Sequence, residues 1–186
     1  MSRDLATTSY ALLGLLAFDA ETSEHGLTGY ELKQRADFTL RFYWTSPAMS
    51  QIYSELARLS RAGLVEVIAE QRGRRLTRRY KLTTDGLETL QSWLAETEPE
   101  FPVLKHPIAL RLMMGHLMDR DALVRMLDEY EKALLDRRAE LEAVREMLGD
   151  RADVRNPVLV AEWGLAYYDA EREIAERTRR RVADER

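Results

Sequence analysis

The residues best suited to chemistry in this chain are the arginines between residues 72 and 81. The segment reads RGRRLTRRYK and carries six basic and no acidic side chains. A guanidinium group offers a planar fork of N–H donors that matches phosphate oxygens. The segment therefore indicates phosphate binding, through Arg72, Arg74, Arg75, Arg78 and Arg79. The alternative is an exposed hairpin whose charges only maintain solubility, since charge runs are common on protein surfaces.

Two short strands are expected to hold these arginines. Residues 64–70, LVEVIAE, are rich in β-branched side chains, and Gly73 follows in a short polar turn. After the turn, Tyr80 and Leu82 alternate with polar residues and share one face. The pattern predicts a β-hairpin with the arginines at its tip and along its second strand.

A helix is predicted directly before the hairpin, at residues 47–62. Ser46 can cap it with its hydroxyl, and Pro47 suits its first position, where a missing N–H costs nothing. Gly63 followed by an apolar residue fits its end. Four apolar side chains recur at helical spacing and predict one buried face: Met49, Ile52, Leu56 and Leu59.

The polar side of the same helix is the expected reader of DNA bases. Ser50, Gln51 and Ser54 lie near its start, and Arg58 lies further along. Glutamine can pair with adenine and arginine with guanine in the major groove, whereas contacts to phosphate do not specify sequence. Tyr53 has two open interpretations, a core aromatic beside Ile52 or a phosphate contact.

The order of predicted elements is helix, helix, helix, strand, strand, which is that of a winged helix-turn-helix. The first helix covers about residues 8–18 and is dense in leucine. Thr28 and Glu31 have the spacing of a capping box for the second, with Tyr30, Leu32 and Phe38 as its expected buried face. After the hairpin, a fourth helix carries an apolar stripe formed by Leu87, Leu90, Trp93 and Leu94.

Prolines divide the chain after residue 96. Pro99, Pro102 and Pro107 interrupt any helix there, so we expect residues 97–106 to be a linker. The expected fold class is mainly α. Residues 1–96 form the DNA-binding winged helix-turn-helix, and residues 107–186 form an all-α dimerisation domain of long antiparallel helices.

Two heptad-like seams predict those long helices. In the first, apolar residues step alternately by four and three with Arg137 among them; in the second, Val160, Trp163, Tyr167, Ala170 and Ile174 do the same. A helix start is expected at Asn156 and Pro157, and the tail from Arg177 is expected to fray. The first seam consists of Leu123, Leu127, Tyr130, Leu134, Leu141, Val144 and Leu148.

Composition narrows the function classes. The chain has no cysteine, which excludes disulfides, thiolate metal sites and a cysteine nucleophile. His25, His106 and His116 have no metal-ligand spacing, and no phosphate loop or nucleophile elbow is present, so neither a cofactor nor an enzyme activity is expected. The start of the chain lacks a signal-peptide pattern and no apolar run would span a membrane, which favours the cytoplasm.

The net charge of −4 does not argue against DNA binding, because the acidic excess lies in the second half of the chain. Residues 1–96 carry 12 basic and 12 acidic side chains, whereas residues 97–186 carry 16 and 20. DNA binding needs a local positive surface, since salt screens charges over roughly 8 Å at physiological ionic strength.

Four motifs in register resemble the PadR-type transcriptional regulators. They are YALLGLL at 10–16, GLTGYEL at 26–32, IYSELARLSRAGLV at 52–65 and RRYKLTTDG at 78–86. The linker and helical second half resemble the longer subtype of the family. Ser54 departs from the family pattern, in which many members have proline. The resemblance implies a repressor, a contact between the Tyr53 hydroxyl and a phosphate, and response to flat aromatic or phenolic ligands.

A homodimer is the expected assembly, because a two-helix hairpin leaves apolar stripes without enough cover. Packing only within one subunit remains the alternative. A two-fold dimer would place two reading helices about 34 Å apart on an inverted-repeat operator. The residues expected in the dimer contact are Leu123, Leu127, Tyr130, Leu134, Leu141, Val160, Trp163 and Ile174.

Three aromatic residues are candidates for an effector site: Trp93, Trp163 and Tyr167. Their simpler interpretation is as core residues, which large aromatics usually are. Trp93 is the main candidate, because the resemblance implies that a Trp after the wing faces an apolar cavity. A planar ligand bound there would shift the spacing of the two reading helices and weaken operator binding.

Two classes of function therefore remain. The first is a dimeric, ligand-responsive DNA-binding repressor. The second is a protein-interaction module that uses the winged helix as a platform and the long helices to assemble with a different partner.

Overall fold

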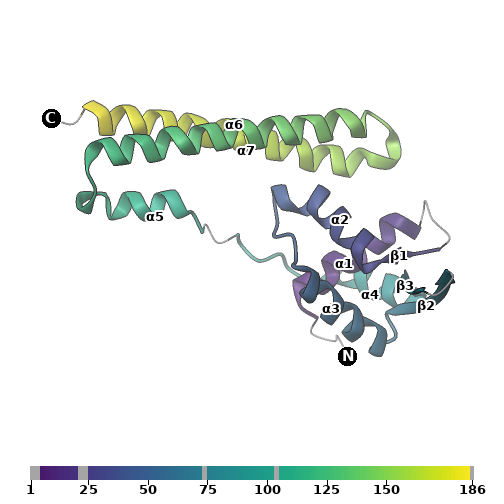
Figure 1. Ribbon diagram of the computed structural model, residues 1–186. Helices are drawn as coiled ribbons and strands as arrows, with labels where there is room; N and C mark the ends of the chain where they lie inside the picture. The colour runs from purple at the N-terminus through teal and green to yellow at the C-terminus, as the bar shows by residue number, and fades with distance from the viewer. Residues whose placement is uncertain (1–4, 21–24, 73–74, 103–104, 185–186) are drawn as a thin grey trace. The chain divides into compact units, whose positions relative to one another are not determined.

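The computed structural model describes residues 5–20, 25–72, 75–102 and 105–184. The chain divides into two compact units, residues 1–100 and 101–186. The expected fold class is confirmed: a winged helix comes first and long helices follow (Figure 1). In the described ranges, no helix is both long and apolar enough to cross a membrane.

The first unit contains a small sheet and four α-helices. The sheet is antiparallel in the order β1-β3-β2, and β3 pairs with β2 along its whole length. A two-residue strand, β1, adds to the predicted hairpin by pairing Leu27 with Tyr80 and Thr28 with Arg79. The elements are α1 (Thr7–Ala20), β1 (Leu27–Thr28), α2 (Gly29–Thr39), a 3-10 turn (Leu40–Phe42), α3 (Met49–Arg61), β2 (Val65–Arg72), β3 (Arg75–Leu82) and α4 (Thr84–Glu96).

One apolar core joins these elements. The predicted buried face of α3 is confirmed, since Ile52, Leu56 and Leu59 are fully buried and Met49 is half-buried. Complete burial of such a side chain stabilises a fold by about 1.5–3 kcal/mol. The contacting core side chains of α1 and α2 are Leu12, Leu13, Leu16, Leu32 and Ala36.

The predicted start of α3 is wrong by two residues. The helix begins at Met49, with Ala48 at its N-cap and no side chain capping it. The Ser46 hydroxyl instead donates to Asp37 Oδ1 at 2.6 Å and accepts from Lys33 Nζ at 3.1 Å. Because α2 occupies the Ser46 hydroxyl, that group is not free to cap α3.

The predicted end of α3 is confirmed. Gly63 has a φ of +75°, and the amides of Gly63 and Leu64 donate to the carbonyls of Ser60 and Leu59, both at 3.0 Å. This is the Schellman arrangement, which needs a left-handed residue at the glycine position. The helix therefore stops where the first strand of the hairpin must start.

Helix α2 begins with the predicted capping box, in which the Glu31 amide donates to Thr28 Oγ1 and the Thr28 amide donates to Glu31 Oε2. Its predicted buried face is only partly right. Leu32 is buried, but Tyr30 is 60% exposed and Phe38 is 41% exposed. Residues four apart share a helix face, so Tyr30 and Phe38 lie together on the side away from Leu32 and Ala36.

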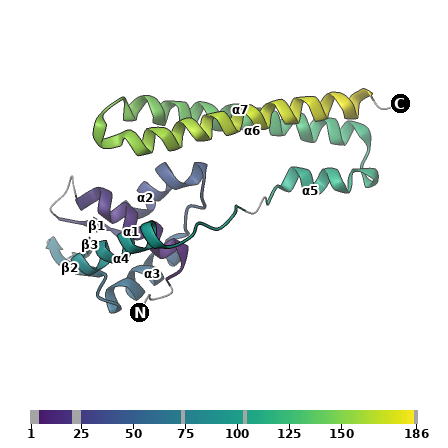
Figure 2. The same ribbon diagram turned by 180° about the vertical axis from the view of Figure 1, so that it is seen from behind.

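The second unit is built on two long antiparallel helices, which lie side by side in both views (Figure 1, Figure 2). Helix α7 begins at Arg155, two residues before the predicted start at Pro157, and the expectation that its tail frays is wrong. It continues to Asp184, and Arg179 forms an ion pair with Asp128 of α6 at 3.2 Å. The elements are α5 (Pro107–Met113), a 3-10 turn (Gly115–Leu117), α6 (Arg120–Leu148), a 3-10 turn (Ala152–Val154) and α7 (Arg155–Asp184).

The seam predicted on α6 packs within the hairpin, whereas the seam predicted on α7 is wrong. Leu127, Leu134, Leu141 and Val144 of α6 are buried. The face of α7 that packs against α6 consists mainly of small residues, and a Cβ added to Gly164 would lie 2.6 Å from Leu141 Cδ2. The buried residues of α7 are Ala161, Gly164, Tyr168 and Ala175.

The large apolar residues of α7 lie on a different side of the helix. We name them the α7 stripe: Leu159, Val160, Trp163, Tyr167 and Ile174. Trp163 is 78% exposed, and the other four are exposed as well. The prediction failed because it weighted residue size, while close helix packing at this seam selects alanine and glycine.

A glycine substitution tests the packing of α4 against the end of α3. We expect Gly86→Ala to destabilise the first unit by about 1–3 kcal/mol, because its Cβ would lie 2.1 Å from the backbone oxygen of Leu64. Gly14→Ala is the matched control. A Cβ at Gly14 meets nothing within 4 Å, so the free energy of unfolding of this variant should rise by about 0.5–1 kcal/mol. Urea unfolding measures both, and equal stability of the two variants would contradict the packing.

Candidate nucleic-acid interface

The outer face of α3 carries polar side chains that no described residue of the first unit covers. Ser50, Gln51 and Ser54 are exposed, as predicted for base-reading residues. The Ser54 hydroxyl donates to the backbone oxygen of Gln51 at 2.9 Å, which leaves its lone pairs outward. Arg61, the last residue of the helix, is also exposed, and sequence reasoning did not assign it a role.

Tyr53 lies at one flank of this outer face. Its side chain is 47% exposed, and its ring packs against the first residue of α2. A Cβ at Gly29 would lie 2.5 Å from Tyr53 Cε1, so glycine is needed for this close approach. One side of the Tyr53 ring therefore packs against α2 and the rest faces solvent, so a phosphate contact stays a prediction.

Arg58 is oriented toward α1 instead of the outer face. Its Nη2 donates to Ser9 Oγ at 3.2 Å, and its Nε lies 3.6 Å from Glu55 Oε2. The side chain is 39% exposed. The position of Arg58 thus differs from that of Ser50 and Gln51, with which the sequence grouped it.

The wing arginines fall into three groups. Arg74 lies outside the described residues, and so do the side chains of Arg72 and Arg75, whose backbones pair with each other across the hairpin. Arg78 is exposed. Arg79 Nη1 instead donates to the backbone oxygen of Gly26 at 2.8 Å and lies 3.3 Å from Glu31 Oε2.

Arg79 and Glu31 connect the sheet to the start of α2. The pKa of Glu31 is lowered, first by the hydrogen bond from the Thr28 amide, against an opposing effect of burial, and further by the charge of Arg79. The pKa of Tyr80 is raised by burial, with Arg78 acting in the opposite direction. The base of the wing is thereby fixed to α2, and Arg78 lies near that fixed base.

Trp93 packs in the first unit as part of its core. Its ring stacks on Tyr10, with ring centroids 4.4 Å apart and planes at 8°. This matches the simpler interpretation made from the sequence. Trp163 and Tyr167, the other two effector candidates, lie in the α7 stripe of the second unit, so no shared site with Trp93 is described.

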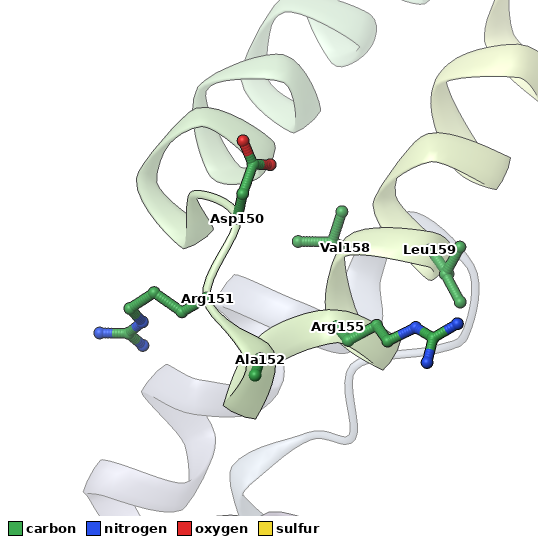
Figure 3. A pocket seen from close by; sticks show the side chains of 6 residues that line it. All are labelled: Asp150, Arg151, Ala152, Arg155, Val158 and Leu159. Atoms are coloured by element: carbon green, nitrogen blue, oxygen red, sulfur yellow. The ribbon is translucent and has the colours of Figure 1, made fainter.

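An open hollow of about 250 Å³ lies where α6 turns into α7 (Figure 3). Its lining contains three apolar side chains, Ala152, Val158 and Leu159. The guanidinium groups of Arg151 and Arg155 point to opposite sides of it. Arg151 forms an ion pair with Asp153 at 3.2 Å. None of the three aromatic effector candidates is among the residues that line it.

His106 ends the linker and holds α5 to the long hairpin. Its Nδ1 accepts from the Ala109 amide at 3.1 Å, and its Nε2 lies 2.6 Å from Glu171 Oε1. The Tyr130 hydroxyl lies 3.1 Å from both His106 Nε2 and Glu171 Oε1. Burial raises the pKa of Tyr130, and the nearby Glu171 carboxylate adds to the increase. Sequence spacing gave no sign of this group, because its members come from three separate segments.

The residues predicted for dimerisation fall into two sets, one packed within the chain on α6 and one exposed on α7. Leu127, Leu134 and Leu141 are buried between α6 and α7 of the same chain. Leu123 is half-buried on α6, and Tyr130 is held by His106 and Glu171. The exposed set lies on α7 and consists of Val160, Trp163 and Ile174.

Comparison with known protein families gives one match in each unit. Residues 20–92 match the model of the transcriptional regulator PadR-like family, and residues 104–183 match a model described as virulence activator alpha C-term. The first unit is therefore similar to the PadR-like family of transcriptional regulators. The chain is 29% identical over 133 residues to the negative transcriptional regulator PadR of Bacillus subtilis, covering 71% of this chain and 68% of the relative.

Solved structures of the Bacillus subtilis protein share the fold of this chain. The crystal structure of PadR in complex with operator DNA has a TM-score of 0.81 and 22% identity, covering 95% of this chain and 99% of that one. The complex with p-coumaric acid has a TM-score of 0.74 and 21% identity, covering 96% and 100%. The winged helix of this chain therefore has the fold of the PadR winged helix.

The contact between Glu31 and the wing gives a pH-dependent prediction. We expect Glu31→Gln to lower stability at neutral pH by about 0.5 kcal/mol, a small value because the side chain is partly exposed. Since the folded-state pKa of Glu31 is below its ordinary value of 4.5, its contribution is present above that pH and is lost as the pH falls through the folded value. The difference from wild type should therefore shrink in acid.

Unfolding of both proteins in urea at neutral and acid pH measures this effect. Glu88→Gln, at an exposed position of α4, is the matched control and should change little at either pH. A loss for Glu31→Gln that stays equally large once the Glu31 carboxyl of the folded protein is protonated would show that the carboxylate charge is not the cause.

Proposed function

We propose that this protein is a homodimeric, sequence-specific DNA-binding repressor of the PadR type. A small aromatic or apolar effector would release it from an inverted-repeat operator. The observation that carries the proposal is the division of α3 into two faces. Its apolar face is completely used in the core, while Ser50, Gln51 and Ser54 remain uncovered. A helix of this kind in a winged helix-turn-helix can enter the major groove.

The proposed DNA contacts follow from where the side chains lie. Gln51, Ser50 and Ser54 would contact base edges from the start of α3. Tyr53 at one flank and Arg61 at the end of the helix would contact phosphates. On the wing, the exposed Arg78 would contact a phosphate, with Arg72, Arg74 and Arg75 toward the tip. Arg79 is better suited to holding the wing, because its Nη1 is bonded to Gly26 and Glu31.

The α7 stripe supports the proposal of a homodimer. A contiguous exposed apolar patch of this kind usually marks an interaction surface. A symmetric contact through Val160, Trp163 and Ile174 would join two copies, because in a two-fold dimer the same patch occurs on both partners. Two reading helices would then meet two operator half-sites about one helical turn apart.

A negative role is proposed because the Bacillus subtilis relative is described as a negative regulator. The description of the model matching residues 104–183 names an activator, so the sign of regulation needs its own measurement. The sign can be measured with a reporter gene placed behind an operator that the protein selects from random sequence. Loss of reporter expression when the protein is co-expressed supports repression, and increased expression contradicts repression.

Disruption of the α7 stripe tests the dimer and its link to DNA binding. We expect Trp163→Asp to convert the dimer to a folded monomer, since an aspartate there would be desolvated in the interface. Operator affinity should then fall at least about tenfold, because one copy reaches only one half-site. Sedimentation and a mobility shift with a duplex selected from random sequence measure the two effects.

The control is Ala139→Asp, which places the same charge at an exposed position of α6. It should remain dimeric and bind as wild type does. A wild-type protein that is monomeric at micromolar concentration, or that shows no sequence-preferring shift at any salt concentration, would favour the protein-interaction module instead.

A phenolic ligand tests effector release. The structure of the relative with p-coumaric acid makes this acid the first probe for the present chain. We expect it to lower operator affinity and to change tryptophan fluorescence through Trp93, whose ring is stacked in the first unit. Trp93→Phe should keep the stacking on Tyr10 and remove most of the fluorescence change. Quenching with no change in operator affinity would contradict the coupling.

A further inference from the structure

A buried polar residue of α1 contacts the reading helix. Ser9 is 0% exposed although its side chain is polar. Its hydroxyl donates to the Glu55 carboxylate and accepts from Arg58 Nη2 at 3.2 Å. Arg58 Nε lies 3.6 Å from the same Glu55 oxygen. We name Ser9, Glu55 and Arg58 the Ser9 cluster; within it, each side chain interacts with the other two.

The Ser9 cluster lies on one flank of α3. Glu55 and Arg58 are three residues apart and therefore neighbours on the helix surface, next to the buried stripe. Tyr53 lies on the opposite flank, where its ring packs against Gly29 of α2. The outer face with Ser50 and Ser54 lies between the two flanks.

These contacts differ in kind from those of the core. Apolar contacts through Ile52, Leu56 and Leu59 hold α3 against the core, but the hydrophobic effect has no direction and tolerates a small rotation of the helix. Hydrogen bonds weaken steeply when their angles change. Hydrogen bonds from the buried Ser9 hydroxyl to Glu55 and from Arg58 to Ser9, all on one flank, therefore resist rotation of α3 about its own axis.

We infer that the Ser9 cluster is a positioning device for DNA reading: it sets the rotation of α3, so that Ser50, Gln51 and Ser54 face the base edges. The inference rests on the proposed function. It makes Ser9 and Glu55 positioning residues and gives Arg58 the same role in place of reading guanine. Recognition depends on such precision, since binding groups must be held within roughly 0.5 Å and 10–20° of their productive geometry.

Ser9→Ala is the most direct test. Alanine fits where serine was and favours the helix, while Glu55 and Arg58 remain as an ion pair, so the variant should fold. The wild-type protein is first used to select a preferred duplex from random sequence. The measured quantity is the ratio of affinities for this duplex and for a scrambled duplex of the same composition.

We expect Ser9→Ala to lower this ratio about five- to tenfold while leaving the slope of log affinity against log salt unchanged. A rotated helix loses base contacts, but no phosphate contact is removed. The matched control is Ser92→Ala, which removes a hydroxyl that donates to Glu96 at 2.8 Å on exposed α4, and its ratio should equal that of wild type. Thermal unfolding records stability in parallel.

A double-mutant cycle distinguishes positioning from a general loss of stability. Ser9→Ala combined with Glu55→Gln should lower the ratio no further than the more severe single variant, because both act through one cluster. Arg58→Gln should reduce discrimination at several base pairs of the duplex and keep the salt slope. Loss of discrimination at one base pair alone would instead identify Arg58 as a direct reader and overturn its positioning role.

The outcomes separate this inference from the proposed function. If wild type prefers its selected duplex and Ser9→Ala gives the same ratio as wild type, the positioning role is overturned and the DNA-binding function stands. The positioning role is also overturned if the effects of Ser9→Ala and Glu55→Gln on the ratio are additive. If wild type selects no duplex at all, both the function and the positioning role are overturned.

Discussion

The contact between the apolar face of α3 and the leucines of α1 and α2 is the interaction on which the rest of the first unit depends. Three fully buried side chains, Ile52, Leu56 and Leu59, hold the helix against the core. Because all of its large apolar residues face inward, the opposite face is left polar and uncovered. The same contact determines where the Schellman turn at Gly63 begins the hairpin, and so where the wing lies relative to α3.

Polar contacts then fix the orientation of elements that apolar burial alone does not determine. Ser9 and Glu55 act on one flank of α3 and Tyr53 on the other, while Arg79 and Glu31 join the sheet to the start of α2. Each of these groups lies partly or wholly out of water, where an unpaired partner would be costly. In the second unit, His106, Tyr130 and Glu171 hold α5 to the hairpin in the same way.

Much of the fold could be predicted because its signals are local. The capping box at Thr28 and Glu31, the glycine stop at Gly63 and the period of the α3 stripe each depend on residues within a few positions of one another. The failures involve partners distant in sequence. Ser46 fits a helix cap by type and position, but α2 takes its hydroxyl. The seam of α7 was misplaced because Gly164 and Ala161, not Trp163, fit against Leu141.

The sequence by itself determined the order of elements, the polar surface of α3, the arginine-rich hairpin and the similarity to the PadR-like family, since periodicity and local motifs carry this information. Only the tertiary structure decided which polar residues face outward. It turned Arg58 toward Ser9 and Arg79 toward Glu31, and it left Trp163 uncovered while burying Tyr168. The physical reason is that a side chain's role depends on which distant group satisfies its hydrogen bonds or fills its space, and spacing along the chain does not encode that group.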